Sequence, residues 1–500
     1  MNVARNLERS AFFFPDRPAV SAGGRELTYR AFNEQAGRVA AALLGLGIKP
    51  NDPVALCAPN SPDWLIFYFA VLKTGAVAVT LSSLLQPDEL ALLLNHCQPH
   101  FIFTQDDKLP ELEPFKTSGF LERIIAPQGD LRLSELIQKG SSDFQALERD
   151  RGDTAAVLYT GGTTGIPKGV SLSHENINTS IHNVVFSEHS CSDDRALCFL
   201  PFNHVFGQMH IMNATILSGG CLEILPAFDL ERVLHLISEE RVTKFYAVPT
   251  IYTRLLTLPG LKEKLGRIRY CFSAAASLAA ETVRQWREVT GLTIHEGYGM
   301  TESASAVTYN HIYRHRIGSV GEAVPGLEVQ IRDLSGNLLN SNQEGEICIR
   351  GRNIMKGYLH NPEETRAAFW EKGWFRSGDI GYLDEKGYLY IVDRLKDMVI
   401  TGGENVYPRE VEEVLYTRSE VQECSVVGLP DPDWGERVTA FIVPRTGHSV
   451  AIAELKAFLK SRLSPFKVPK EYVIVDEMPK SPAGKILKRE LKGRYTRKKC

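Results

Sequence analysis

A helical repeat of apolar residues stands out between residues 28 and 47. Thr28 is placed to cap the start of a helix, and Gly45 and Gly47 are placed to end it. The apolar positions between them recur at spacings of four, three and four, and they are Phe32, Ala36, Val39 and Leu43. This spacing predicts a helix with one buried face.

Short apolar strands and apolar helices alternate in the segments that follow. The predicted strands cover residues 53–56, 76–79 and 101–103, and the predicted helices cover residues 64–72 and 90–94. Later strands are predicted at residues 196–200, 244–248, 270–272 and 293–295, with a helix at residues 230–237. Strands that alternate with helices predict an α/β fold built on parallel sheets.

Two further strands, at residues 155–159 and 170–172, flank a loop that reads TGGTTGIPKG. Glycine backbone N–H groups can crowd around an anion because no Cβ is in the way. The threonine hydroxyls and the lysine would complete a phosphate cradle. The lysine does not directly follow a glycine, and no helix signal follows the loop, so it is not a Walker loop. The alternative is an ordinary Gly/Thr hairpin.

The pattern changes at about residue 318 to short alternating runs with glycine turns, which is typical of a β-rich region. A charged stretch at residues 393–397 then lies between two apolar strands. The remainder carries helix signals at residues 410–415 and 452–463 and strand signals at residues 425–428, 439–443 and 472–475.

These patterns predict an α/β protein of two domains. The large N-terminal domain, residues 1–395, would hold mixed and parallel sheets with helices, and a β-rich subdomain at about residues 318–395. Residues 396–500 would form a small α+β domain. A chain of 500 residues exceeds what one core usually holds, which agrees with this division.

Composition limits the classes of function. The net charge of −3 gives no general attraction to nucleic acid. The nine cysteines are scattered and form no CxxC pair, which indicates reduced thiols and no zinc or disulfide framework. The start of the chain lacks the apolar core of a signal peptide, and the run at residues 64–72 is too short to cross a bilayer. We therefore expect a cytoplasmic protein without a transmembrane segment.

Seven stretches occur in one order along nearly the whole chain. They are YTGGTTGIPKG (159–169), LPFNHVFG (200–207), EGYGMTES (296–303), GEICIRG (345–351), WFRSGDIG (374–381), DRLKDMVITGGENVYPREVE (393–412) and SPAGKILKREL (481–491). Together they resemble the adenylate-forming superfamily of acyl-CoA synthetases, adenylation domains and firefly-type luciferases. The resemblance implies a reaction in two halves: a carboxylate attacks the α-phosphate of MgATP, and a thiol then displaces AMP.

The resemblance also implies an ATP site. The phosphate cradle would be Thr160, Gly162, Thr163, Thr164 and Lys168. Gly161 stands where the family usually has serine. Tyr298 would stack on adenine, Asp379 would accept from the ribose hydroxyls, and Arg394 would contact ribose or phosphate. Glu296, Gly297 and Gly299 flank Tyr298 in the same site.

Four residues would carry the chemistry of the first half-reaction. Thr301 resembles the α-phosphate contact and Glu302 the Mg²⁺ ligand, since one carboxylate plus phosphates and water is enough for this cation. Lys485 resembles the small-domain lysine that bridges the substrate carboxylate and the α-phosphate. His204 resembles the histidine beside the acyl pocket. The alternative role is structural: a histidine at a strand end whose ring nitrogens are hydrogen-bonded within the protein.

The second half-reaction would use a different face of the small domain. Lys396 occupies the family's hinge position, and rotation there would exchange Lys485 for Gly402, Gly403 and Glu404. The two glycines would let the pantetheine arm of CoA pass close to the backbone.

The acyl pocket is expected near His204, Val248, Ala274, Ala275, Ala276, Gly297 and Val307. Apart from the histidine these residues are small or apolar, which counts against an amino-acid substrate. The small side chains at 274–276 favour an extended alkyl chain, while a flat aryl acid is the alternative.

The prediction is an ATP-dependent acid–thiol ligase that makes an acyl-adenylate and then an acyl-CoA, from a medium- or long-chain fatty acid. The alternatives are an aryl-acid CoA ligase, an acyl-AMP ligase that loads an acyl carrier protein, and a catalytically silent acyl or nucleotide sensor. ATP, Mg²⁺ and coenzyme A are the expected cofactors and cosubstrates. The expected partners are a small carboxylic acid and CoA or a carrier protein, with a homodimer as a hypothesis and no nucleic acid.

Overall fold

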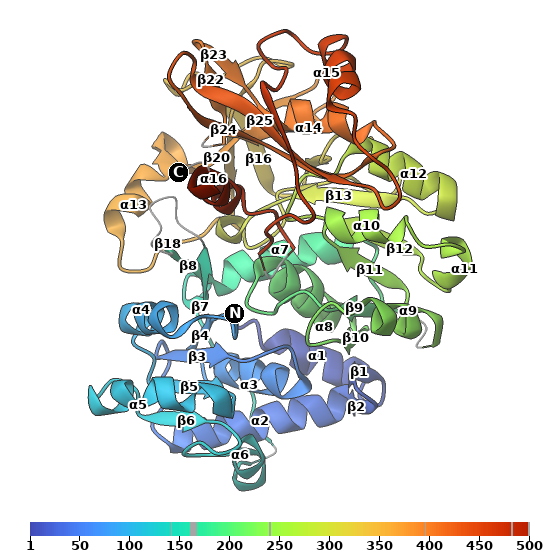
Figure 1. The fold of residues 1–500 in the computed structure, drawn as a ribbon. Helices are drawn as coiled ribbons and strands as arrows, with labels where there is room; N and C mark the ends of the chain where they lie inside the picture. Colours follow the sequence, from blue (N-terminus) through green and yellow to red (C-terminus); the bar gives the residue numbers. More distant parts are fainter. Residues whose placement is uncertain (142, 161–167, 240–241, 396, 482–483, 499–500) are drawn as a thin grey trace.

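The structure is a computed structural model that describes residues 1–141, 143–160, 168–239, 242–395, 397–481 and 484–498. Four sheets are present in these residues, two large and two small (Figure 1). The predicted α/β fold class is confirmed.

The first large sheet has seven strands, most of them parallel. Their spatial order is β18 (Gly357–Tyr358), β8 (Lys168–Ser173), β7 (Thr154–Thr160), β4 (Val77–Thr80), β3 (Pro53–Cys57), β5 (Phe101–Thr104) and β6 (Arg123–Ile125). β7, β4, β3, β5 and β6 run parallel, whereas β8 and β18 each pair antiparallel with their neighbour. The predicted strands around the glycine loop are therefore antiparallel partners.

Helices in the N-terminal part of the chain accompany this sheet. They are α2 (Tyr29–Gly45), α3 (Pro62–Lys73), α4 (Pro87–Cys97), η1 (Asp106–Lys108), α5 (Leu109–Thr117) and α6 (Leu133–Lys139). The predicted cap of α2 is confirmed, because Thr28 Oγ1 accepts from the backbone N–H of Ala31. Every residue of α3 from Trp64 to Lys73 is buried, as expected for a helix that is apolar on all sides.

The second large sheet has nine strands. Their order is β15 (Glu322–Ala323), β14 (Thr308–Tyr309), β13 (Ile294–Tyr298), β12 (Tyr270–Ser273), β11 (Lys244–Ala247), β9 (Arg195–Cys198), β10 (Cys221–Ile224), β1 (Pro18–Ala22) and β2 (Arg25–Thr28). The strands from β13 to β1 run parallel, and the outer strands at both edges pair antiparallel. The carboxyl ends of β11, β12 and β13 therefore lie at one edge.

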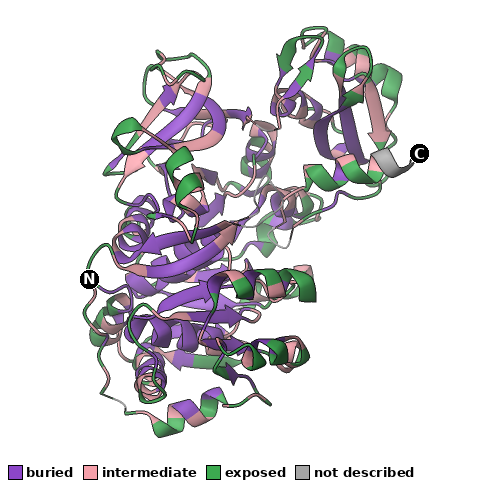
Figure 2. Ribbon diagram, turned by 90° about the vertical axis from the view of Figure 1, so that its left-hand side faces the viewer, coloured by how far each residue is buried: buried purple, intermediate pink, exposed green. Residues whose placement is uncertain are grey.

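The helices of this second layer are α1 (Arg5–Phe13), α7 (His174–Ser187), η2 (Phe206–Asn213), α8 (Ala214–Ser218), α9 (Leu230–Glu239), α10 (Pro249–Leu255), α11 (Leu261–Lys264), α12 (Ala280–Thr290) and η3 (Thr301–Ser303). One continuous apolar core joins both large sheets, and Figure 2 shows buried residues concentrated in their strands. Among the described helices, none combines the length and the hydrophobicity needed to cross a membrane.

A third sheet follows where the β-rich pattern begins. It contains β16 (Leu327–Arg332), β17 (Gly345–Gly351), β20 (Trp374–Leu383) and β19 (Phe369–Trp370), and β21 (Leu389–Arg394) pairs with β20. The short helix α13 (Pro362–Ala367) leads from β18 to β19, and η4 (Glu371–Gly373) connects β19 to β20.

The fourth sheet begins beyond Arg394 and has its own apolar core. Its strands are β23 (Glu404–Val406), β22 (Val399–Thr401), β25 (Gly435–Pro444), β24 (Val421–Asp431) and β26 (Glu471–Ile474). Its helices are α14 (Pro408–Tyr416), α15 (Ile452–Lys460) and α16 (Lys488–Lys498). At the start of α12, the backbone N–H of Ala280 donates to Glu413 Oε2 of α14 at 3.3 Å, which ties this unit to the second large sheet.

Candidate active site

The edge where β11, β12 and β13 end gathers the predicted acyl-pocket residues. Val248 directly follows β11, Ala274–Ala276 follow β12, and Gly297 is the next-to-last residue of β13. Val307 joins them from the next segment, where its backbone N–H donates to the carbonyl of Tyr298 at 2.8 Å. Parallel strands place their carboxyl ends together, and such an edge is a common ligand site in α/β proteins.

Tyr298 and Asp379 meet although they come from different sheets. The phenol of Tyr298 donates to Asp379 Oδ2 at 2.7 Å, and Arg394 Nε lies 3.4 Å from Asp379 Oδ1. Asp379 and Arg394 are opposite each other on β20 and β21, so the strand register creates their ion pair. The structure thus brings together the three side chains expected at adenine and ribose.

The segment after β13 carries Thr301 and Glu302 on η3, and Gly299 lies between β13 and η3. Tyr358 OH donates to Glu302 Oε1 at 3.1 Å. Burial nevertheless raises the pKa of the Glu302 carboxyl above its usual value. A carboxylate that is desolvated in this way gains from a nearby cation, which fits the hard oxygen ligand that Mg²⁺ prefers.

Thr160 and Lys168 are paired across β7 and β8 at the two ends of the glycine loop. Lys168 forms an ion pair with Glu364 of α13, and its ammonium lies 5.1 Å from the centroid of the Tyr358 ring. Gly162, Thr163 and Thr164 of the predicted cradle lie outside the described residues, as does Gly161.

Lys485 lies close to His204. Lys485 sits in a tight turn in which its backbone N–H donates to Ser481 Oγ at 3.2 Å. A Cβ added to Gly484 would meet Val248 Cγ2 at 2.7 Å, so this turn packs directly on the end of β11. Desolvation lowers the pKa of His204 to about 4, and the Lys485 ammonium acts in the same direction. His204 is therefore neutral near pH 7.

Glu296 is buried on β13, and its Oε2 has no hydrogen-bond partner among the described residues. Burial raises its pKa to about 8, Arg409 opposes this shift, and Glu413 adds to it. Both of these neighbours belong to α14, so the carboxyl group faces the fourth sheet's unit.

The residues expected to act in the second half-reaction lie away from the ends of β11, β12 and β13. Gly402 and Gly403 form the exposed turn between β22 and β23, with φ of +60° and +85°, and Glu404 begins β23. A Cβ on Gly402 would meet the Trp434 ring of the same unit at 2.8 Å. In Figure 1 this hairpin lies at the end of the unit away from β11 and β12. Lys396 lies outside the described residues.

Three neighbours of the site were missed in the sequence. Tyr358 contacts Glu302, and Glu364 contacts Lys168. Neither Tyr358 nor Glu364 lies in one of the seven stretches, and each contact joins residues far apart in the sequence. Phe272 could have been found, because it ends the predicted strand at residues 270–272, two residues before Ala274.

Comparison with protein families gives two matches. The family described as AMP-binding enzyme matches residues 7–359, and the AMP-binding enzyme C-terminal domain matches residues 410–485. The chain is 37% identical to a long-chain-fatty-acid–CoA ligase of Bacillus subtilis (strain 168), over 97% of this chain and 93% of that protein. It is 36% identical to a feruloyl-CoA synthase of an Amycolatopsis species, over 97% of this chain and 98% of that protein.

Solved structures agree with these matches. ATP-bound MatB from Rhodopseudomonas palustris superimposes with a TM-score of 0.92 at 34% identity, over 99% of both chains. The apo form of the same protein gives a TM-score of 0.83.

Proposed function

This chain belongs to the AMP-binding enzyme family, and on that premise we propose that it is an ATP-dependent, AMP-forming acid–CoA ligase. The resemblance to adenylate-forming enzymes is confirmed. The observation that carries the proposal is the packing of the Lys485 turn on Val248, at the strand edge that also holds Tyr298 and Thr301. One cation from the C-terminal unit thereby reaches the edge where an acid and a nucleotide would meet.

In the first half-reaction, a carboxylate oxygen bonds to the α-phosphorus and the bond to pyrophosphate breaks. Two anions must approach each other, so positive charge and hydrogen-bond donors are required. Lys485 would neutralise the carboxylate and α-phosphate, and Thr301 would orient the α-phosphate. Lys168 and Thr160 would hold the leaving pyrophosphate. Mg²⁺ at Glu302 would supply further charge neutralisation.

In the second half-reaction, the CoA thiol attacks the acyl carbon and AMP leaves. We assign residues 1–395 and 396–500 to two bodies that rotate at Lys396 between these steps. The exposed β22–β23 turn supports this role, because Gly402 and Gly403 present backbone without side chains to a thiol arm. The structure superimposes better on ATP-bound MatB than on apo MatB. This supports an orientation of the C-terminal unit that suits the first half-reaction.

The proposed acid is a medium- or long-chain fatty acid. The small residues at 274–276 and the fatty-acid relative support this choice. An aryl acid is the second candidate, and the feruloyl relative supports it. A carrier protein in place of CoA and a silent sensor are the remaining alternatives. A reducing, cytoplasmic location is supported by the eight cysteines of the described part, all of which are free thiols.

The test measures the two half-reactions separately in the Lys485→Ala variant. Pyrophosphate release from acid plus ATP should fall by at least about a hundredfold, while thioester formation from a supplied acyl-adenylate should persist. Lys480→Ala is the matched control, since Lys480 lies nearby and pairs with Glu423 of its own unit. Equal loss of both half-reactions in Lys485→Ala would refute the assignment. Silence of the wild type across fatty and aryl acids would favour the sensor, and light scattering would test the homodimer.

A further inference from the structure

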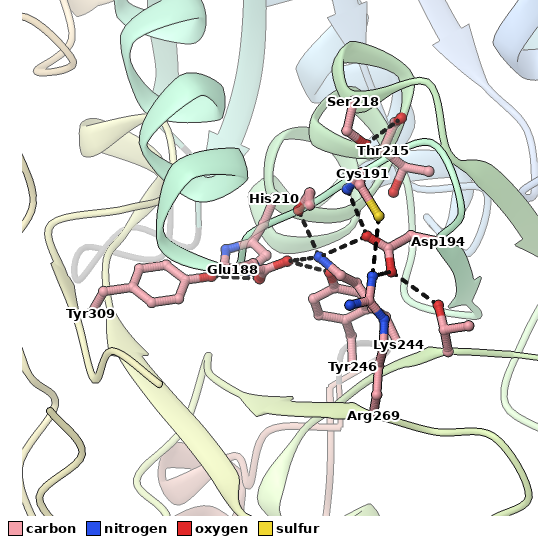
Figure 3. A network of polar contacts seen from close by, with 12 residues as sticks. Glu188, Cys191, Asp194, His210, Thr215, Ser218, Lys244, Tyr246, Arg269 and Tyr309 are labelled. Atoms are coloured by element: carbon pink, nitrogen blue, oxygen red, sulfur yellow. Dashed lines mark hydrogen bonds and ion pairs between the residues drawn. The ribbon is translucent and has the colours of Figure 1, made fainter. Parts of the chain in front are cut away.

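A buried carboxylate, Glu188, collects four hydrogen-bonding groups just after α7 (Figure 3). Its Oε2 accepts from Lys244 Nζ at 2.9 Å and from the Tyr246 phenol at 2.5 Å. Its Oε1 lies 2.9 Å from His210 Nε2 and 2.6 Å from the Tyr309 phenol. Each of these side chains is almost completely buried, so the network is rigid and costly to break.

A second carboxylate completes the charge balance. Asp194 lies 3.5 Å from Lys244 Nζ and forms an ion pair with Arg269. Burial opposes the charge on Glu188, but Lys244 and the hydrogen bonds from His210 and Tyr246 outweigh it and hold its pKa below the usual range. The functional assignments made above use none of these residues.

Strand register places aromatic side chains next to the ends of β11, β12 and β13, where the acyl pocket is predicted. Side chains two residues apart share one face of a strand and are about 7 Å apart along it. Tyr246 and Phe272 are opposite each other on β11 and β12, two residues before Val248 and Ala274, which follow the ends of these strands. Tyr309 is directly opposite Gly297 in the β13–β14 pair.

The ring of Phe272 closes the space next to Gly297. A Cβ on Gly297 would lie 2.8 Å from Phe272 Cζ. The His210 ring packs on Phe272 with centroids 4.5 Å apart and stacks on Tyr309 at 5.7 Å. His210 Nδ1 lies 3.3 Å from Ser305 Oγ, so both ring nitrogens have polar neighbours and the ring is held in one orientation.

We propose that Phe272, His210 and Tyr309 form a floor that limits the length of the acid, and that Glu188 holds this floor in place. This inference rests on the proposed acid–CoA ligase function and narrows its acid. Because this floor precedes Ala274 by only two residues, we expect a medium-length chain or a compact aryl ring to be preferred. Long chains require the floor to move, and the ion pairs beneath it oppose that movement.

The experiment measures kcat/KM for pyrophosphate release with octanoate, dodecanoate, hexadecanoate and benzoate. In the wild type, octanoate and benzoate should exceed hexadecanoate. Phe272→Leu and His210→Ala should raise the ratio of hexadecanoate to octanoate by about tenfold, because roughly two further methylenes become buried. Glu188→Gln should raise the same ratio to a smaller extent, since it removes the charge but keeps the shape.

His174→Ala is the control for loss of a buried histidine, because His174 lies at the start of α7 and accepts from Val3 N. It should leave the ratio unchanged. Phe272→Leu touches no ion pair, so it remains informative if His210→Ala fails to fold. Unchanged ratios in active Phe272→Leu would overturn the floor, as would a wild type that prefers hexadecanoate. Absence of turnover with every acid would instead count against the ligase function itself.

Discussion

The phenol oxygen of Tyr298 lies 2.7 Å from Asp379 Oδ2 and donates a hydrogen bond to it, across 81 positions of sequence. The ring expected beneath adenine and the carboxylate expected at ribose are thus held together by a direct hydrogen bond. Burial and Asp379 together raise the pKa of Tyr298, so the phenol remains a donor throughout the physiological range.

Asp379→Ala should weaken ATP binding by about ten- to a hundredfold, because hydrogen bonds to a charged group contribute about 1.5–3 kcal/mol each. Tyr298→Phe should weaken it by only about threefold, since the stacking ring remains. Titration calorimetry with ATP would measure both. Equal effects of the two substitutions would contradict the assignment of ribose binding to Asp379.

We expect Glu364 to compete with phosphate for Lys168. Because the two side chains form an ion pair, Glu364→Gln should tighten ATP binding by about two- to fivefold, as expected for a partly exposed pair. Glu363→Gln, one residue earlier in the same helix, is the matched control. Weaker ATP binding in Glu364→Gln would show that this carboxylate assists the cradle instead.

Gly484→Ala should slow adenylation by about tenfold or more, because the new methyl group would meet Val248 and displace the Lys485 turn. Gly447→Ala is a close control: its φ of +80° matches the +79° of Gly484, and nothing lies within 4 Å of its added Cβ. Both variants carry the same backbone strain. Similar pyrophosphate-release rates in the two would show that the Val248 contact is unimportant.

Acid should destabilise the protein through His174. Burial lowers its pKa to about 4, with Arg149 and the N-terminal amine acting in the same direction. The unfolded chain takes up this proton at about pH 6.5 and the folded chain only at about pH 4, so stability is lost as pH falls between these values. The loss from this one group is about 2 kcal/mol at pH 5.

Thermal unfolding at pH 7 and pH 5 would measure this effect. The midpoint of the wild type should fall at the lower pH, and His174→Gln should reduce that fall. His182→Gln, on the exposed face of the same helix, should leave the fall unchanged. An equal fall in wild type and His174→Gln would exclude His174 as a source.

Much of the fold follows from short-range pattern. The apolar run at residues 64–72 predicts the buried α3, and Thr28 with the repeat after it predicts α2. Caps and apolar repeats depend only on residues close together in the sequence. They therefore predict a helix without knowledge of where that segment lies in the fold. The order of the seven stretches likewise indicates the family without any coordinates.

Contacts between distant segments were decided only by the tertiary structure. Lys168 meets Glu364 across 196 positions, and Glu188 meets Tyr309 across 121. No local period encodes such pairs, because they depend on which strands become neighbours and in which register. The sequence by itself determined many of the helices and strands and the chemistry available. Strand order and the placement of the C-terminal unit decided that the Lys485 turn packs on Val248 and that the Phe272 ring lies against Gly297.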